Sequence, residues 1–454
     1  MDHSFFWGNS VSSMQTEGGW NEGGKSLSVY DIQEAGENKS DWHFANDNYH
    51  HFEEDMDLMK DLGMNMYRFQ ISWSRCVRDG CGEFNEEGLQ YYDRFIDALI
   101  ERGIEPMICL YHFDMPLYLA EQFDGFLSKE TVRCFVRFGK KIIDRFAHKV
   151  KYWITFNEQN LYSSPIAYRI AGVLKAEPSE QNLLQITHNV MAAHCKLSNY
   201  LHEHTNALIG GMVAYTPRYP ASCRPEDVQA AERFNELMYY NLMDAFAGRG
   251  YSPLFMKYLS TSGICIDMTK EELEAIGQCR SDHIAFSYYQ SGVIDSERLP
   301  ASGASVYEYG KYGNVQNPYL KASEWGWQID PEGFRTIMTA MYSRYRIPVF
   351  PIENGIGVRE TWNGTDMIED DYRIDYHRAH IKAMKEAMDL DGVEVLGYLG
   401  WGLIDILSSH GDMEKRYGVV YVNRGNHDLR DMKRVPKKSY YWLKQVIASN
   451  GEIL

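Results

Sequence analysis

Two short segments of the chain each place a glutamate beside an asparagine at the end of an apolar run. Thr155–Glu158 (Thr-Phe-Asn-Glu) and Pro351–Asn354 (Pro-Ile-Glu-Asn) follow β-branched and aromatic residues, and their glutamates lie 195 residues apart. A half-buried carboxylate needs a partner, so a core strand rarely ends in this way without a reason. Enzymes that cleave a glycosidic bond use a pair of facing carboxyl groups as their catalytic groups. We therefore take Glu158 and Glu353 as candidate catalytic residues.

Glycoside cleavage requires one carboxyl group that stays protonated and one that stays ionised near neutral pH. Arg68 stands inside an apolar strand pattern, Tyr-Arg-Phe-Gln-Ile, and a buried arginine needs a carboxylate partner. We expect it to pair with Glu353, to lower the pKa of that carboxyl group and to keep it nucleophilic, with Tyr289 donating a further hydrogen bond. Glu158 has no cation nearby in sequence, so an apolar setting would raise its pKa and suit a general acid/base. Either glutamate alone would more often be an ordinary solvated or salt-bridged residue.

Eight short apolar runs alternate with amphipathic stretches along the chain. One stretch, Leu89–Arg102, carries an apolar stripe at helical spacing that includes Ile100, and Gly103 suits the left-handed position that ends a helix. Strand–helix alternation repeated eight times favours an α/β fold of the closed (β/α)8 TIM-barrel type, while the pattern alone leaves an open sheet as an alternative. The predicted strands are Phe5–Ser10, Met64–Ile71, Glu105–His112, Tyr152–Asn157, Leu208–Tyr215, His283–Tyr289, Pro348–Glu353 and Val395–Trp401.

In such a barrel the C-terminal ends of the strands converge on one face, where barrel enzymes keep their active sites. Aromatic faces pack against sugar rings, and the chain has ten tryptophans and 32 tyrosines. Most of these rings must belong to the core or the surface, and we place Trp327 and Trp401 in the pocket. The residues at strand ends that could meet a substrate are His112, Glu158, Tyr288, Tyr289, Glu353 and Trp401.

The composition predicts one large folded domain. With 454 residues, 44% hydrophobic content and neither a linker nor a repeat, we expect a single barrel domain over residues 1–454. The 46 basic and 63 acidic residues give a net charge of −17 without a basic stripe, which argues against nucleic acid as a partner. No apolar window reaches about 18 residues and the N-terminus lacks the features of a secretion signal, so we expect a cytoplasmic protein without membrane attachment.

The eight cysteines are scattered, mostly within apolar runs. Cys76 and Cys81 could form half of a metal site, but no second Cys/His pair at ligand spacing complements them. We expect reduced thiols, no metal and no cofactor. Composition does not reveal an interface, so homo-oligomer formation stays open.

The chain resembles glycoside hydrolase family 1, the retaining β-glycosidases, over nearly its whole length. Phe6–Gly18 (Phe-Trp-Gly-Asn-Ser-Val-Ser-Ser-Met-Gln-Thr-Glu-Gly) is similar to the N-terminal signature of the family, whose glutamine, here Gln15, binds sugar hydroxyls. His112–Pro116 resembles the family's histidine motif, with Phe113 in place of the commoner tryptophan. The resemblance implies a TIM barrel that needs no metal.

The two glutamate segments resemble the acid/base and nucleophile motifs of the same family. Asn157 then corresponds to the asparagine that bonds the sugar 2-hydroxyl. The resemblance implies a double displacement in which Glu353 attacks the anomeric carbon while Glu158 protonates the leaving oxygen and later activates water. Because both carboxylates are present, the thioglucosidase branch, which replaces the acid/base glutamate, is disfavoured.

The stretch after the last predicted strand departs from plain family β-glucosidases. Those carry Trp-Ser-x-x-Asp-Asn-Phe-Glu-Trp, whose glutamate binds the sugar O4 and O6, whereas Trp401–Ser409 places Ser408 at the glutamate position. Lys415 and Tyr417 follow, and this spacing is similar to the 6-phospho-β-glycosidase branch, in which serine, lysine and tyrosine hold the substrate phosphate. A carboxylate about 4 Å from a phosphate would cost roughly 4 kcal/mol per charge pair at an effective dielectric of 20, so its loss fits a phosphorylated substrate.

The resemblance therefore favours a cytoplasmic 6-phospho-β-glucosidase that acts on phosphorylated cellobiose or aryl β-glucosides. Such an enzyme would work downstream of an uptake system that phosphorylates sugars. A 6-phospho-β-galactosidase is the alternative, but in that branch a tryptophan follows the phosphate-binding serine, and here the position is Ser409. An unphosphorylated β-glucosidase conflicts with Ser408 and Lys415. A catalytically inactive sugar-phosphate-binding protein would be expected to lose one of the two glutamates.

Overall fold

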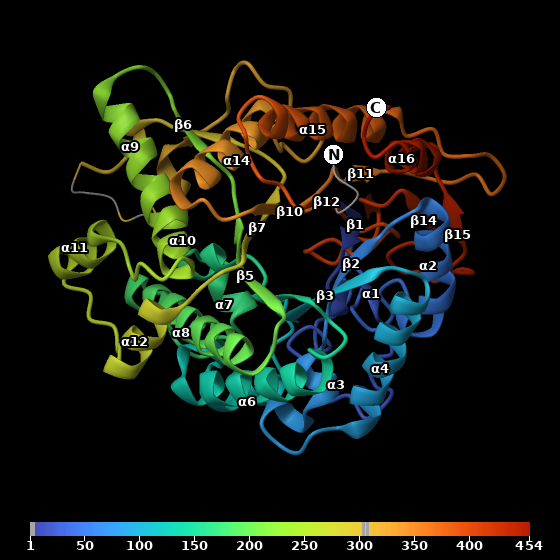
Figure 1. The fold of residues 1–454 in the computed structure, drawn as a ribbon, viewed down its shortest axis with the longest axis horizontal. Coiled ribbons are helices and arrows are strands. Elements are labelled where there is room, and N and C mark those ends of the chain that lie inside the picture. Colours follow the sequence, from blue (N-terminus) through green and yellow to red (C-terminus); the bar gives the residue numbers. More distant parts are fainter. Residues whose placement is uncertain (1–4, 302–304, 306–307) are drawn as a thin grey trace.

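The computed structural model describes residues 5–301, 305 and 308–454 of the chain. Eight parallel strands form a barrel in the order β10-β7-β5-β4-β3-β2-β1-β12, and a parallel bridge between Val349 and Val395 closes β10 against β12 (Figure 1). All eight predicted strands are confirmed, and their bounds agree within two residues. The barrel strands are β1 Phe6–Ser10, β2 Met66–Gln70, β3 Glu105–Tyr111, β4 Tyr152–Phe156, β5 Leu208–Ala214, β7 His283–Tyr288, β10 Val349–Asn354 and β12 Gly397–Trp401.

Helices surround the barrel and cover its outer face (Figure 1). They are α1 Ser13–Thr16, α2 Asn48–Leu62, α3 Trp73–Cys76, α4 Glu86–Glu101, α5 Leu117–Phe123, α6 Lys129–Phe146, α7 Ala167–Ile170, α8 Glu180–His204, α9 Pro225–Asn235, α10 Asn241–Phe246, α11 Pro253–Ser262, α12 Lys270–Gln278, α14 Pro331–Tyr345, α15 Asp371–Asp389 and α16 Lys438–Ala448. The short helical turns are η1 Arg78–Gly80, η2 Gly125–Leu127, η3 Gln159–Ser163, η4 Glu236–Tyr240, η5 Ser296–Arg298 and η6 Tyr309–Gly313. None of the described helices combines the length and apolarity needed to cross a membrane.

Helix α4 shows how the sequence pattern becomes packing. Its predicted stripe buries Phe95 and Leu99 against the barrel, and Gly103 adopts the left-handed conformation after the helix, with φ +75°. Ile100 departs from the expectation, because it lies at the edge of the stripe and stays 42% exposed.

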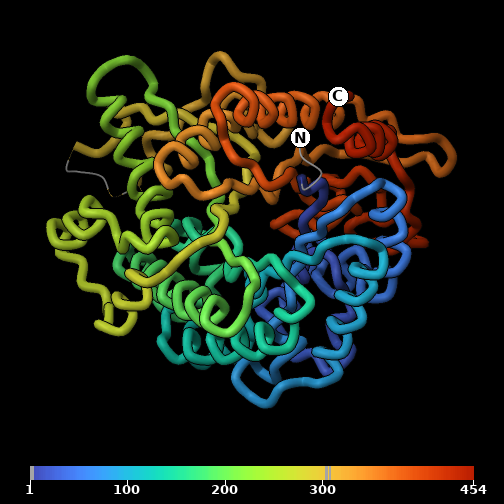
Figure 2. Tube along the Cα trace, in the orientation of Figure 1, coloured from blue at the N-terminus to red at the C-terminus, as the bar shows by residue number. Residues whose placement is uncertain are grey.

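Short strands on the C-terminal face of the barrel order the loops. They are β6 Arg218–Pro220, β8 Gly292–Ile294, β9 Asn314–Val315, β11 Val358–Arg359, β13 Lys415–Arg416, β14 Val420–Val422 and β15 Arg434–Pro436. β11 pairs with β13 in antiparallel register, and this pairing brings the segment after β12 beside the segment after β10. The two chain ends also meet, because Trp7 Nε1 donates to Asn450 Oδ1 over 2.8 Å; Figure 2 follows the trace from one end to the other.

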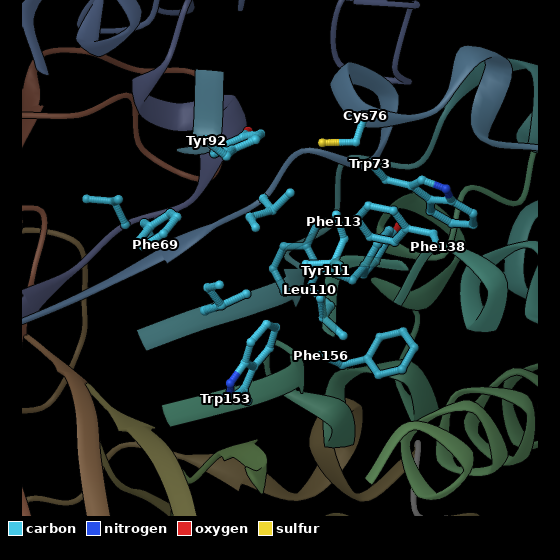
Figure 3. Packing of buried hydrophobic residues seen from close by; sticks show 14 of the residues in the cluster. Phe69, Trp73, Cys76, Tyr92, Leu110, Tyr111, Phe113, Phe138, Trp153 and Phe156 are labelled. Atoms are coloured by element: carbon cyan, nitrogen blue, oxygen red, sulfur yellow. The ribbon is translucent and has the colours of Figure 1, made fainter. Parts of the chain in front are cut away.

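The core has two layers. Inside the barrel, side chains such as Met66, Cys109 and Phe350 fill the space beneath the strand ends. Outside it, aromatic rings pack between the strands and the helices, and Trp73 stacks on Phe138 with ring centroids 5.7 Å apart (Figure 3). All eight cysteines are free thiols, as expected. Side chains thus fill the interior of the barrel, and the site forms above them at the C-terminal ends of the strands.

Candidate active site

Arg68 on β2 and Glu353 on β10 form a buried ion pair at the C-terminal face of the barrel. Nη1 of the arginine lies 2.8 Å from Oε1 of the glutamate, and both side chains are almost fully buried. The Tyr289 hydroxyl, just beyond β7, donates to Oε2 of the same carboxylate over 3.1 Å. Both contacts that the sequence predicts for Glu353 are therefore present.

Arg68 lowers the pKa of Glu353, as predicted, but the net pKa of this carboxyl group is raised and not lowered. Burial raises the pKa of this carboxyl group to about 8, and the nearby Glu158 raises it further, while Arg68 and Tyr289 act in the opposite direction. Because the site is closed on several sides, the loss of hydration outweighs the single guanidinium. The sequence revealed the counter-ion but not the depth of the burial.

Glu158 stands between β4 and η3 in a left-handed conformation, with φ +47°. Such a backbone is costly for a non-glycine residue, so the surrounding structure must hold it. The Ser287 hydroxyl on β7 donates to Oε1 of Glu158 over 2.5 Å. Burial raises the pKa of Glu158, as the sequence predicts. Ser287 was missed, although its place at the end of a predicted strand was the signal that could have identified it.

Asn157 and His112 each present a polar atom that has no hydrogen-bond partner among the residues that the structure describes. Oδ1 of Asn157 accepts from Nη2 of Arg68 over 2.7 Å, while Nδ2 has no partner among the described residues. The His112 ring lies 5.5 Å from the Trp401 ring, and its Nδ1 is likewise unpartnered within the described chain. Burial lowers the pKa of His112 well below its usual range, so the ring is neutral. These two atoms are suited to hydroxyl groups of a ligand.

Gln15 and Tyr288 are engaged within the protein. The Gln15 amide donates to the Leu407 carbonyl over 2.7 Å and accepts from the Ser12 hydroxyl over 2.6 Å. Tyr288 donates to the Asp330 carbonyl over 2.7 Å. Gln15 keeps a second N–H and a second lone pair for a ligand, whereas the fully buried Tyr288 ring belongs to the core.

Lys415 lies in a cage of aromatic rings. Its Nζ is 4.1 Å from the ring centre of Trp327, 4.6 Å from that of Trp325 and 5.4 Å from that of Tyr417. It makes neither an ion pair nor a hydrogen bond with any residue that the structure describes. Burial lowers the pKa of Lys415 to about 8. Trp325 was not among the predicted site residues, although it stands two positions from Trp327.

Local structure sets the direction of the Lys415 side chain. In strand β13 successive side chains alternate, so Arg416 points the other way, donates to the Val422 carbonyl over 3.0 Å and pairs with Asp405 at 3.5 Å. Gly357, beside the paired strand β11, leaves the room, because a Cβ there would come within 2.6 Å of Cε of Lys415. The Lys-Arg pair of the sequence thus divides into a site cation and a structural cation.

Tyr289 connects the lysine cage to the carboxylates. Its ring lies 5.5 Å from that of Trp327 and 6.5 Å from that of Tyr417, while its hydroxyl reaches Glu353. Ser408 precedes Lys415 by seven residues and is buried. Its hydroxyl oxygen accepts a hydrogen bond from the backbone N–H of Asp412 over 3.1 Å. A ligand anion bound at Lys415 would be close to a sugar ring held against Glu353.

One cluster of metal-ligating side chains occurs in the described part of the chain. His194, Cys195 and Cys279 are buried together, with their ligand atoms within 4.8 Å of one another. His194 Nδ1 shares a hydrogen bond of 2.6 Å with the Thr155 hydroxyl on β4. The cluster shares no hydrogen bond with either glutamate, so we assign it no part in the site.

Comparisons with known proteins agree with the geometry. The family model for glycosyl hydrolase family 1 matches residues 1–452. The aryl-phospho-β-D-glucosidase BglH of Bacillus subtilis is 39% identical, with 99% of this chain and 98% of that protein covered. The 6-phospho-β-glucosidase AscB of Escherichia coli is 35% identical over the same shares of the two chains. Among solved structures, a family 1 β-glucosidase from Thermotoga maritima matches with a TM-score of 0.88 and 27% identity, covering 99% of this chain and 98% of that one.

Proposed function

The chain belongs to glycosyl hydrolase family 1, and from that premise we propose that it hydrolyses 6-phospho-β-D-glucosides with retention of anomeric configuration. The observation that carries the proposal is the Lys415 ammonium group, which has aromatic neighbours but no direct counter-ion among the described residues, because the carboxylates of Asp412 and Glu324 act on it only from beyond ion-pair distance. A phosphate group would supply that counter-ion. The two curated relatives compared above, at 39% and 35% identity, are named as phospho-β-glucosidases, which supports the same substrate class.

Glu353 is the proposed nucleophile and Glu158 the proposed general acid/base. Burial raises the pKa of both, so near neutral pH the pair holds a proton. Arg68 and Tyr289 both donate to Glu353, which favours the charge on that carboxylate and the proton on Glu158. Glu353 then attacks the anomeric carbon while Glu158 protonates the leaving oxygen. In the second step Glu158 takes a proton from water, the water oxygen bonds to the anomeric carbon, and the bond between that carbon and Glu353 breaks.

The other polar groups are proposed to hold the sugar. Asn157 would bond the 2-hydroxyl through its unpartnered Nδ2, while His112 and Gln15 would bind further hydroxyls. Trp401 and Trp327 would pack against the ring faces. Ser408, Lys415 and Tyr417 would bind the phosphate. Ser408 carries no negative charge, so it adds a hydroxyl without repelling the anion.

We further propose glucose over galactose as the sugar, because a serine, Ser409, stands where the phospho-galactosidase branch has a tryptophan. Phosphorylated cellobiose or aryl β-glucosides would be the substrates. A sugar 6-phosphate carries nearly two charges and does not cross a bilayer unaided, so we place the enzyme in the cytoplasm, downstream of an uptake system that phosphorylates its cargo.

The test is kcat/KM on four chromogenic substrates, the β-glucoside, the β-galactoside and the 6-phosphate of each. The proposal expects the glucoside 6-phosphate to exceed the other three. Its advantage over the free glucoside should be about 100-fold, which corresponds to one charge-assisted contact with the phosphate. Preference for the free glucoside would overturn the phosphate assignment. Preference for the galactoside 6-phosphate would overturn only the sugar assignment.

A further inference from the structure

A cavity of about 370 Å³ is lined by residues that neighbour the acid/base glutamate along the chain and across the sheet, although Glu158 itself does not line it. Its wall begins at Asn160, two residues after Glu158, and Asn160 binds both backbone groups of Ala214 over 2.7 and 3.0 Å. Ala214, also in the wall, is in register with Ser287, whose hydroxyl donates to Glu158. The cavity therefore adjoins the side of the site from which the proton is delivered.

The wall combines apolar surface with positive charge. Its charged residues in the described chain are Arg218 and Lys311, and it contains no carboxylate among the residues that line it. The whole chain has a net charge of −17, so a cavity that bears cations and lacks acids departs from the average surface. The apolar lining residues are Leu161, Pro165, Ala214, Phe234, Met238 and Tyr239. This wall suits a flat apolar group that carries a negative charge.

Arg218 is held in place without a carboxylate partner among the described residues. Its Nη1 donates to Asn314 Oδ1 over 3.1 Å, and its guanidinium lies 5.5 Å from the centre of the Phe234 ring. Its Nε is buried and has no acceptor within the described chain. Gly292 makes room for the guanidinium, because a Cβ there would come within 1.7 Å of Nη1. A fixed, planar donor of this kind matches the two oxygens of a carboxylate.

We propose that this cavity receives the aglycone and that Arg218 selects aryl aglycones that carry a carboxylate. The inference rests on the proposed function, because a leaving group protonated by Glu158 must lie on the Glu158 side of the sugar. During cleavage the bond between the anomeric carbon and the aryl oxygen breaks, and that oxygen takes the Glu158 proton. The carboxylate of the aglycone stays ionised throughout and serves only in recognition.

The test compares 4-carboxyphenyl and 4-carbamoylphenyl 6-phospho-β-D-glucosides, which are close in shape and differ in charge. We expect Arg218→Gln to lower kcat/KM for the carboxylate at least about tenfold more than for the carboxamide, because a charge-assisted contact is lost. The intrinsic difference in reactivity between the two leaving groups cancels, because the unmodified enzyme and the variant are assayed with the same two substrates. Arg224→Gln is the matched control, because Arg224 is exposed, pairs with Glu297 and does not line the cavity.

A second measurement needs no variant. Free 4-hydroxybenzoate should inhibit the unmodified enzyme competitively at a concentration at least about tenfold lower than 4-hydroxybenzamide, and added salt should reduce the difference. Equal inhibition by the two compounds, or an Arg218→Gln effect equal on both substrates, would overturn the role of Arg218. Failure of the proposed function looks different, because the phosphorylated glucosides would then lose their advantage over the free glucosides whatever the aglycone.

Discussion

Arg68 reaches across the barrel from β2 and contacts Glu353 on β10, with Nη1 and Oε1 separated by 2.8 Å. The same guanidinium donates through Nη2 to Asn157, the residue before Glu158. One buried cation thus holds the proposed nucleophile and the asparagine beside the proposed acid/base. Its two contacts diverge, which a planar guanidinium accommodates and an ammonium group does not.

Arg68→Lys should lower kcat/KM by about 100-fold or more, because a lysine cannot make both contacts and leaves a buried carboxylate less well compensated. Arg68 lowers the pKa of Glu353 against the effect of burial, so its loss raises that pKa. The acidic limb of the kcat/KM–pH profile, which reports the ionised nucleophile, should therefore move to higher pH. Arg102→Lys is the control, since Arg102 also bonds two carboxylates, but on the outer helices. An unmoved acidic limb would contradict the proposed role of Glu353.

The loss of kcat/KM that Glu158→Gln causes should depend on the leaving group of the substrate. With phosphorylated cellobiose, whose leaving alcohol needs a proton, we expect a loss of about 10²–10⁴-fold in kcat/KM. With 2,4-dinitrophenyl 6-phospho-β-glucoside, whose leaving group needs none, the first step should be nearly unchanged. Glu353→Gln should abolish the reaction of both substrates. Glu105→Gln is the control, because burial also raises the pKa of Glu105, yet it stands at the opposite end of its strand. Equal losses on both substrates for Glu158→Gln would remove its assignment as the acid.

Lys415→Met should raise KM for the phosphorylated substrate far more than for the free glucoside. Burial lowers the pKa of this lysine to about 8, so the free enzyme loses the ammonium charge as the pH rises through that value. KM for the phosphorylated substrate should therefore increase above about pH 8 in the unmodified enzyme and lose this dependence in the variant. The control is Lys433→Met, because Lys433 lies over the Trp362 ring, outside the site. A KM for the free glucoside that follows the same pH curve would exclude a phosphate role.

Much of this arrangement could be predicted from the order of residues. Strand ends were recognisable from apolar periodicity, and a barrel brings such ends together, so the contact between Arg68 and Glu353 followed from the pattern. The net pKa of Glu353 did not follow, because it depends on how completely several loops exclude water. Trp325 was missed for a related reason, since the lysine cage joins the segment of Trp325 and Trp327 to a strand about 90 residues later.

Ser287 and Arg218 illustrate the same limit on a smaller scale. Both belong to segments that the sequence assigns to strands or loops without a charged or catalytic motif. Ser287 gains its role only because β7 lies within hydrogen-bonding reach of Glu158. Arg218 is notable only because none of the described residues that line its cavity is a carboxylate, which is a property of the folded chain and not of any short stretch. Motifs therefore locate the reacting groups, and tertiary contacts decide how those groups are tuned.

Ser408→Glu should restore repulsion at the proposed phosphate site. A carboxylate about 4 Å from the phosphate costs roughly 4 kcal/mol per charge pair at an effective dielectric of 20, which corresponds to about 10³-fold in binding. We expect kcat/KM for the phosphorylated glucoside to fall by about 10²–10³-fold, while the value for the free glucoside stays equal or rises. Ser260→Glu is the control, because Ser260 is exposed on helix α11 whereas Ser408 is buried. Equal effects of the two substitutions would show that Ser408 has no special relation to the phosphate.

His283 should make the stability of the fold depend on pH. The ring is buried at the start of β7 between Tyr152 and Phe350, and neither ring nitrogen has a partner among the described residues. Burial lowers its pKa from 6.5 to about 4, so the folded protein keeps the ring neutral. Between these two values the unfolded chain binds a proton that the folded chain does not. The free energy of unfolding therefore decreases as the pH falls below 6.5, and at pH 5 it is lower by about 2 kcal/mol.

His283→Phe keeps a ring of similar shape and removes this proton. We expect the loss of thermal unfolding midpoint between pH 7.5 and pH 5 to be smaller in the variant by about 2–4 °C, measured at one scan rate. A residual slope should remain, because burial also lowers the pKa of His377 and His380. The exposed His148, changed in the same way, should leave the slope unaltered. If His283→Phe has the full slope of the unmodified protein, the ring must be protonated or solvated in the folded state, and the neutral, enclosed histidine described for β7 would be wrong.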